Sequence, residues 1–329
     1  MLIVRSPMRI SYIGGGSDFP HYFSAKQGNV IGATINQYIY VFSNPLSEIA
    51  REKVRFTYRK TESVSDLNEI EHPVLREMLL DLKWKQRINI GTFSELPAGV
   101  GLGGSSAFTV ALAKLLFTQS NLEMPTESLA KYAIRVEREI LKEPGGIQDQ
   151  LHSAYGGFNH FSFVGHDPVI TKTEMPESFA RYLDLRQILV WVGSPRESGN
   201  LAKITSQFAK SEQADISYTS QLALTTSFQI LESDTDQGRF DILCKAVNLG
   251  WDAKKKFTGQ PDSNVEIIET NAFRAGARAV KLCGAGQSGF MLILFDLENR
   301  DKILNELSDF SIIAPKIVQS GASLIHHDM

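Results

Sequence analysis

The sequence is poor in cysteine, and this shortage limits the classes of protein to consider. Its 329 residues include two cysteines, Cys244 and Cys283, which give neither a disulfide framework nor a CxxC metal motif. A reducing compartment suits such a chain, so we expect a cytoplasmic location. The N-terminal stretch MLIVRSPMRI carries Arg5 and Arg9 within its apolar run, so we expect no signal peptide there.

Long apolar runs and dense basic runs are also missing. No apolar stretch reaches the roughly 18 residues that a membrane-spanning helix needs. The net charge is −3, and the lysine cluster DAKKKF around Lys254 is interpreted as a solvated helix face. We therefore expect neither a nucleic-acid partner nor a membrane partner.

The chain has 43% hydrophobic residues, and their spacing predicts a mixture of strands and helices. Hairpins precede helices in the first half, which favours an α+β fold over a doubly wound parallel sheet. Thr126 is the expected N-cap of a helix over 127–142. We expect strands over 30–43 (with a register shift), 53–60, 86–93 and 187–193, helices over 106–117 and 127–142, three polar helices between about 197 and 250, and a strand–loop–strand over 280–295. The polar connector 165–178 is the expected boundary between domains of residues 1–170 and 171–329.

The first glycine-rich segment is PMRISYIGGGSDFP, residues 7–20. Three consecutive glycines are unfavourable in a strand, because each carries extra conformational entropy and no side chain to pack. The close approach of another group to the backbone explains these glycines best, and the carboxylate of Asp18 follows them two residues later.

The second segment, LPAGVGLGGSSAFTVALAKLL, has glycines and serines directly before an expected helix. Backbone N–H groups at a helix N-terminus bind anions, so this loop is a candidate phosphate cradle. It is not a Walker A loop, because no lysine follows the glycines at the required place. A simple strand-to-helix turn is the alternative, although such a turn needs fewer glycines. The candidate nucleotide-binding residues are Pro97, Gly99, Gly101, Gly103, Gly104, Ser105 and Ser106.

Two carboxylates, Glu137 and Asp149, lie between this loop and a third glycine-rich segment, CGAGQSGF. A phosphate loop needs a divalent cation, and Mg²⁺ takes one or two protein oxygen ligands. A second carboxylate can orient an acceptor hydroxyl and take its proton. The alternative is that Glu137 is a surface acid and Asp149 an acid in a turn. By itself, CGAGQSGF could be a simple hairpin.

A dinucleotide-binding oxidoreductase is a different interpretation of the glycines. Gly99, Gly101 and Gly104 have the GxGxxG spacing, which must follow a strand and precede an acidic residue about 20 positions on. Asn121 and Glu123 follow in an expected loop rather than at the end of a second strand. The sequence therefore favours phosphate chemistry over hydride transfer.

In this order, the three segments resemble the motifs of the GHMP kinase superfamily, and the resemblance covers nearly the whole chain. PMRISYIGGGSDFP is similar to its first motif, LPAGVGLGGSSA to its phosphate loop and KLCGAGQSGFMLIL to its third motif. GGGSDFPHYF and GGIQDQLHSAYGGFNHF resemble a branch of bacterial D-glycero-D-manno-heptose 7-phosphate kinases, which phosphorylate the anomeric hydroxyl.

The resemblance implies a ribosomal-protein S5-like N-terminal domain, a ferredoxin-like C-terminal domain, and ATP and Mg²⁺ as cofactors. It implies that Ser105 and Glu137 hold Mg²⁺. Asp149 would be the base or the hydroxyl-orienting carboxylate, and Arg9 would stabilise charge on the transferred phosphoryl group. The implied substrate is a small sugar phosphate, and the expected substrate-binding residues are Gly15, Gly16, Ser17, Asp18, Arg76, Gly284 and Gly286.

The chain also departs from the family pattern. Gln287 and Ser288 stand where relatives usually have glycines, Gly104 where they have serine, and Ile147 where heptose kinases often have lysine. These departures leave open another sugar of the fucose, galactose or mannose type, or a non-catalytic binding protein of the same fold. The resemblance implies that heptose is prepared for a capsule or another surface glycan.

Overall fold

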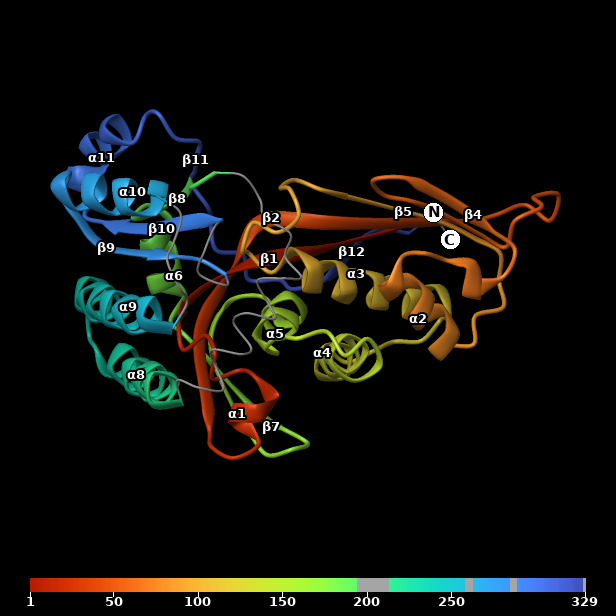
Figure 1. Cartoon of the computed structure of the whole chain (residues 1–329), viewed down its shortest axis with the longest axis horizontal. Helices are drawn as coiled ribbons and strands as arrows, with labels where there is room; N and C mark the ends of the chain where they lie inside the picture. The colour runs from red at the N-terminus through yellow and green to blue at the C-terminus, as the bar shows by residue number, and fades with distance from the viewer. Residues whose placement is uncertain (194–212, 258–262, 285–288, 328–329) are drawn as a thin grey trace.

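The computed structural model describes residues 1–193, 213–257, 263–284 and 289–327. Within these ranges the chain forms two sheets that are covered by helices (Figure 1). The eight-stranded sheet consists of β1 (Leu2–Ile13), β2 (Gly28–Pro45), β3 (Val54–Thr57), β4 (Thr61–Val64), β5 (Ile88–Ser94), β6 (Phe158–Val164), β7 (Val169–Glu174) and β12 (Ser323–His327). The four-stranded sheet consists of β8 (Gln187–Trp191), β9 (Ala277–Leu282), β10 (Phe290–Phe295) and β11 (Ile312–Ile313).

The larger sheet follows the order β12-β1-β2-β5-β3-β4, and β6 and β7 continue it from β2. Its pairs are antiparallel except β3 with β5, so hairpins dominate, as the sequence predicts. The expected register shift in β2 is confirmed, because Pro7 pairs with Tyr38 whereas Met8 pairs with Ile35.

Helices cover one side of this sheet below β1 and β2 (Figure 1). The longest is α3, whose apolar residues are buried around its whole circumference because it packs on the sheet and on α5. The helices of this layer are α2 (Pro73–Asp81), α3 (Gly104–Gln119), α4 (Thr126–Arg135) and α5 (Gln148–Tyr155). Thr126 is the first helical residue of α4, and Pro125 occupies the cap position in its place.

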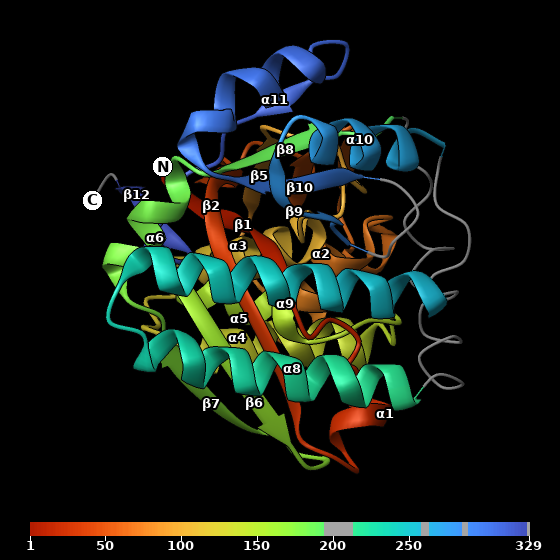
Figure 2. The same ribbon diagram turned by 90° about the vertical axis from the view of Figure 1, so that its left-hand side faces the viewer.

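A pair of long helices joins the two sheets. α8 (Gln213–Glu232) and α9 (Asp236–Phe257) run side by side across one face of the molecule (Figure 2). α8 packs on β2, and α9 packs on β9 of the smaller sheet. They correspond to two of the three polar helices expected between about 197 and 250, while residues 194–212 lie outside the described ranges.

The remaining elements are distributed over both sheets. Residues 169–174, expected to belong to a polar connector, form β7 because they pair along the whole edge of β6. None of the described helices combines the length and apolar character needed to cross a bilayer. The other helical segments are α1 (Pro20–Phe23), η1 (Leu67–Glu69), η2 (Val136–Ile140), α6 (Glu177–Asp184), α10 (Ser263–Arg274), η3 (Leu297–Asn299) and α11 (Arg300–Glu306).

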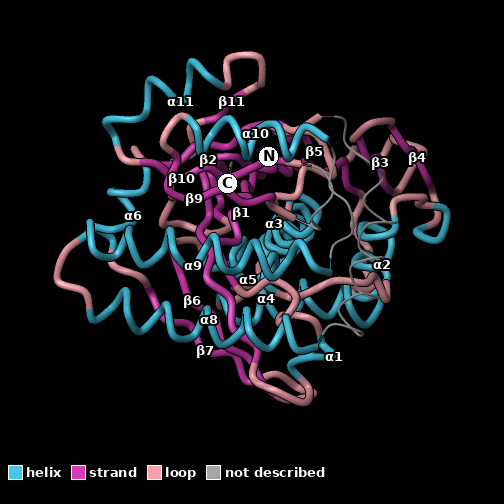
Figure 3. The backbone as a smooth tube through the Cα atoms, turned by 60° about the vertical axis from the view of Figure 1, so that its left-hand side comes forward, coloured by secondary structure: helices cyan, strands magenta, loops and turns pink. Residues whose placement is uncertain are grey.

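The C-terminal strand returns to the N-terminal strand. β12 pairs antiparallel with β1, with Leu2 opposite His327. The two ends of the chain therefore lie close together (Figures 1 and 3). The larger sheet is completed by residues from both ends of the sequence, and the smaller sheet lies between them in chain order.

Candidate active site

Arg9 connects three of the predicted site segments. Its Nε and Nη2 atoms lie 2.8 and 2.7 Å from Oδ1 of Asp149, and its Nη1 donates to the carbonyl of Gly101 at 2.8 Å. The Arg9 side chain is buried, whereas that of Asp149 is 26% exposed. The structure thus brings the two predicted catalytic residues into one ion pair beside the phosphate loop, with the carboxylate on the accessible side.

The phosphate loop leads from β5 into α3. Gly99, Gly101 and Gly103 all have positive φ, so each needs a backbone conformation that glycine adopts without strain. Gly103 lies so close to Asp149 that a Cβ there would be 3.2 Å from Oδ2. The first N–H groups of α3 have no partner within the helix, so they can receive an anion at this end.

The third glycine segment packs directly on this loop. Gly284 has a φ of +72°, and a Cβ on it would lie 2.5 Å from the Cα of Gly101. Gly289 packs in the same way against the carbonyl of Val100. Gly284 therefore packs against the backbone of the phosphate loop and supports that loop. Gly286, Gln287 and Ser288 lie outside the described residues.

Glu137 is buried in η2, a π-helical turn that continues α4. Such turns occur frequently at functional sites. Ser106, not Ser105, donates its hydroxyl to Oε2 of Glu137 at 3.0 Å, while Ser105 is exposed. Burial raises the pKa of this carboxyl, and the neighbouring Arg138, 2.9 Å from Oε2, opposes that rise.

The donor set around Glu137 fits a magnesium ion. Its Oε1 atom is buried and has no hydrogen-bond partner among the described residues. Mg²⁺ prefers carboxylate and hydroxyl oxygens, and it needs one or two of them when phosphates supply others. No group of three or more His, Cys, Asp or Glu side chains in the described ranges is arranged to hold a metal.

The loop after β1, residues 14–19, is held tightly by contacts within the protein. Gly14 has positive φ, and a Cβ on it would lie 2.0 Å from the carbonyl oxygen of Asn29, so close packing on β2 explains this glycine. Gly16 also has positive φ and packs near Ile216 of α8. Ser17 donates its hydroxyl to the carbonyls of Gly14 and Asn29. These residues shape the loop through backbone contacts.

Asp18 is buried at the centre of this loop. Its Oδ1 accepts from the N–H of Gly16 at 2.9 Å, and its Oδ2 accepts from Nε2 of Gln148 at 3.0 Å. Burial, followed by the charge of Asp149, raises the pKa of Asp18. Gly15 has room beside it, because a Cβ there would first meet Nε2 of Gln148, at 3.7 Å. Gly15 is therefore the part of the loop that a ligand could approach.

Arg76 makes local contacts on α2. Its Nη1 donates to the carbonyl of Ile70 at 3.1 Å, and its Nε pairs with Glu77 at 3.0 Å. The side chain is 33% exposed. These contacts tie Arg76 to its own segment, and they do not join it to Asp18 or Asp149.

Two lysines belong to the site region, Lys254, which is half-buried, and Lys281, which is buried, and the sequence interpretation missed both. Lys254, expected on a solvated face, donates to the carbonyl of Gly284, because the start of the third motif covers that side of α9. Lys281 donates to the carbonyls of Ser11 and Tyr12 at 2.8 Å each. Burial lowers the pKa of Lys254 to about 8 and that of Lys281 to about 7.

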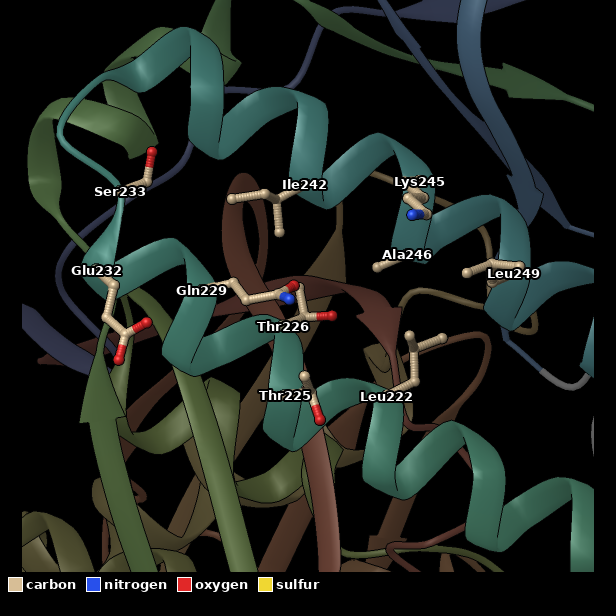
Figure 4. A pocket seen from close by; sticks show the side chains of 10 residues that line it. All are labelled: Leu222, Thr225, Thr226, Gln229, Glu232, Ser233, Ile242, Lys245, Ala246 and Leu249. Atoms are coloured by element: carbon tan, nitrogen blue, oxygen red, sulfur yellow. The ribbon is translucent and has the colours of Figure 1, made fainter.

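A separate groove of about 550 Å³ lies between α8 and α9 (Figure 4). Its walls carry one acid, Glu232, and one lysine, Lys245, and they include none of the predicted site residues. The groove therefore lacks Glu137, Asp149 and the glycine loops that the sequence assigns to phosphate transfer. It is lined by Leu222, Thr225, Thr226, Gln229, Glu232, Ser233, Ile242, Lys245, Ala246 and Leu249.

Comparison with known proteins agrees with the glycine motifs. Residues 70–157 match the GHMP kinases N terminal domain. The chain is 28% identical to the D-glycero-alpha-D-manno-heptose 7-phosphate kinase of Campylobacter jejuni, with 92% of each chain covered. Residues 70–157 thus carry a GHMP kinase N-terminal domain, and nearly the whole chain is similar to a sugar kinase of this kind. These relatives support a sugar kinase within that family, with ATP as the phosphate donor typical of it.

Solved structures share the fold over the whole chain. A D-glycero-D-manno-heptose 1-phosphate kinase from Bacteriodes thetaiotaomicron matches with a TM-score of 0.81 at 22% identity, covering 100% of both chains. The Methanococcus jannaschii mevalonate kinase matches with a TM-score of 0.72 at 19% identity, covering 96% of this chain and 98% of the other. The predicted two-part α+β GHMP kinase fold is confirmed.

Proposed function

We propose that this chain transfers the γ-phosphoryl group of ATP to the C1 hydroxyl of D-glycero-D-manno-heptose 7-phosphate, giving the 1,7-bisphosphate and ADP. The observation that carries the proposal is the ion pair of Arg9 with Asp149, which adjoins the glycine loop at the start of α3. The name of the Campylobacter jejuni relative supports the choice of sugar.

The proposed roles follow from the positions of the charged groups. Asp149, the more accessible partner, accepts a hydrogen bond from the C1 hydroxyl and orients it toward the phosphorus. Arg9 keeps Asp149 in place and stabilises the negative charge that develops on the transferred group. The glycine loop and the N-terminus of α3 bind the nucleotide phosphates.

The proposed metal ligands are Glu137 and Ser106. The sequence predicts Ser105 in place of Ser106, and the contact with Glu137 favours Ser106. When bound, Mg²⁺ neutralises charge on the phosphates. The residues of this chain hold the metal-binding carboxylate in a fixed position, because Ser106 and Arg138 both contact Oε2. Asp18 and Gly15 are the proposed contacts of the sugar hydroxyls.

Arg76 is the proposed ligand of the remote 7-phosphate. Its guanidinium suits a phosphate, and one third of the side chain is accessible. Binding of the remote phosphate would help to orient the reacting hydroxyl, so a sugar without it should lose turnover as well as affinity. We place the reaction in the cytoplasm, in agreement with two cysteines that are both free and buried, and propose that its product supplies a surface glycan.

The deciding experiment is a coupled ADP-release screen with ATP and Mg²⁺. The panel contains the heptose 7-phosphate, the same heptose without phosphate, mannose, fucose and galactose. We expect the 7-phosphate to be turned over far faster than the others, with the new phosphate on C1 by ³¹P NMR. A faster free sugar would keep the kinase and reject the proposed substrate, whereas no turnover with any sugar would favour a non-catalytic binding protein.

A further inference from the structure

The first residues of α5 contact three different parts of the site. Gln148 donates its Nε2 to Asp18 at 3.0 Å, and Gln150 donates its Nε2 to Oε2 of Glu137 at 2.6 Å. Asp149, between them, pairs with Arg9. Consecutive helical residues point about 100° apart, so three neighbours at a helix start can reach three separate groups.

Both glutamines are buried and serve buried carboxylates. Gln150 is fully buried and Gln148 is 7% exposed, while Asp18 and Glu137 are 2% and 1% exposed. A buried carboxylate without donors is costly. An amide donates a hydrogen bond without adding charge, so it fixes the carboxylate and leaves its negative charge available to a cation or a hydroxyl.

The contacts on Glu137 are one-sided. Ser106, Arg138 and Gln150 all donate to Oε2, and Oε1 has no partner among the described residues. Three donors on a single oxygen determine how the carboxylate is rotated. Gln150 lies 2.6 Å from Oε2 and makes the shortest of these bonds.

The two glycines before α5 allow this arrangement. A Cβ on Gly146 would lie 1.7 Å from Oδ2 of Asp18, and a Cβ on Gly145 would lie 2.9 Å from Nη2 of Arg138. The backbone before α5 can approach both carboxylate clusters only because these positions lack side chains. The start of α5 is therefore packed directly against the partners of its two glutamines.

We propose that Gln148 and Gln150 are positioning residues for phosphoryl transfer, in which Gln150 orients Glu137 so that its Oε1 is available to Mg²⁺, and Gln148 orients Asp18 toward the acceptor sugar. This inference rests on the proposed kinase function. It assigns separate effects to two neighbouring amides, which a general structural role would not produce.

The test compares Gln150→Met and Gln148→Met with the wild type. Methionine keeps the length of glutamine and removes the donor. Gln150→Met is expected to raise the Mg²⁺ concentration needed for binding of AMP-PNP about tenfold or more, the usual effect of losing a residue that orients a metal ligand. This binding is measured by calorimetry without any sugar.

Gln148→Met is expected to raise the KM of the best sugar of the screen about tenfold, because a hydrogen bond to a buried charged group is lost. Its Mg²⁺ requirement should equal that of the wild type. Gln187→Met is the matched control: Gln187 is a buried glutamine on β8 that accepts a hydrogen bond from Tyr12. It should change thermal stability and neither of the two constants.

The inference is overturned if both variants change both constants equally, or if they lower only thermal stability. Should a methionine variant not fold, Gln150→Asn and Gln148→Asn decide, because they keep the amide and withdraw it by one methylene. The Mg²⁺ dependence of AMP-PNP binding is measured without sugar, so it still tests the role of Gln150 if the proposed substrate is wrong. Wild-type binding of AMP-PNP that is indifferent to Mg²⁺ would overturn both proposals.

Discussion

Replacing Gly284 by alanine tests the contact between the third motif and the phosphate loop. The new Cβ would lie 2.5 Å from the Cα of Gly101, and ordinary contact begins at 3.4 Å, so the backbones must separate by about 0.9 Å. Because both atoms belong to the backbone, no side-chain rotation relieves the overlap. The positive φ of Gly284 adds roughly 1–2 kcal/mol of strain for alanine. A misplacement of this size near the chemistry costs about 10²-fold in rate.

The expected result is a fall of about 10²-fold in kcat/KM for ATP, measured by coupled ADP release, with a lower temperature of unfolding. Gly250→Ala is the matched control. Gly250 lies inside α9, and its Cβ would make only ordinary contacts, with Ile13 at 3.7 Å and Leu222 at 3.8 Å. It should retain activity within a few fold, because alanine is favoured over glycine inside a helix. Equal activity of Gly284→Ala and the wild type would refute the proposed support of the loop by the third motif.

Three further predictions concern single charged groups. Asp149→Asn should keep ATP binding and lower turnover by at least about 10²-fold in ADP release, and near-normal turnover would remove Asp149 from its proposed role. Glu137→Gln should raise the Mg²⁺ requirement in a magnesium titration, because a protein ligand becomes neutral; a curve that overlays the wild type would reduce Glu137 to a structural acid. Lys281 has a folded-state pKa of about 7, below its unfolded value of 10.5, so the unfolded chain binds one more proton between these pH values and stability rises with pH there. Urea unfolding should show that the free energy of unfolding of the wild type, relative to that of Lys281→Met, increases by on the order of 4 kcal/mol from pH 7 to pH 10. An equal pH dependence of the two proteins would contradict this.

The elements with strong local patterns could be predicted from the sequence. The alternation in residues 30–43 predicts β2 and its irregular register. The glycine segments predict the phosphate loop, which contacts Arg9 through Gly101, and the third segment, which packs on that loop. These features depend on neighbouring residues and on backbone conformation, which the sequence states directly. The family resemblance predicts that Arg9 and Asp149, 140 residues apart in the sequence, belong to one site, and the structure adds that they form an ion pair.

The choice between adjacent or similar residues could not be predicted. Ser105 and Ser106 differ by about 100° around α3, and only the position of Glu137 on another element decides which serine contacts it. Lys254 has the sequence surroundings of an exposed lysine, but the third motif covers it. The roles of Gln148 and Gln150 depend in the same way on distant partners. A local QDQ sequence contains no information about three clusters that the fold alone assembles.

The return of β12 to β1 has a consequence for synthesis on the ribosome. Residues up to 174 contain the other strands of the larger sheet, but one edge of β1 stays unpaired until Ser323–His327 emerge. At 5–20 residues per second, the intervening 148 residues (175 to 322) need roughly 7 to 30 s. During that interval a nascent chain exposes an open strand edge of the kind that pairs with other chains. The last strand thus covers the edge of β1 only at the end of synthesis, and a chain truncated before residue 323 would keep that edge unpaired.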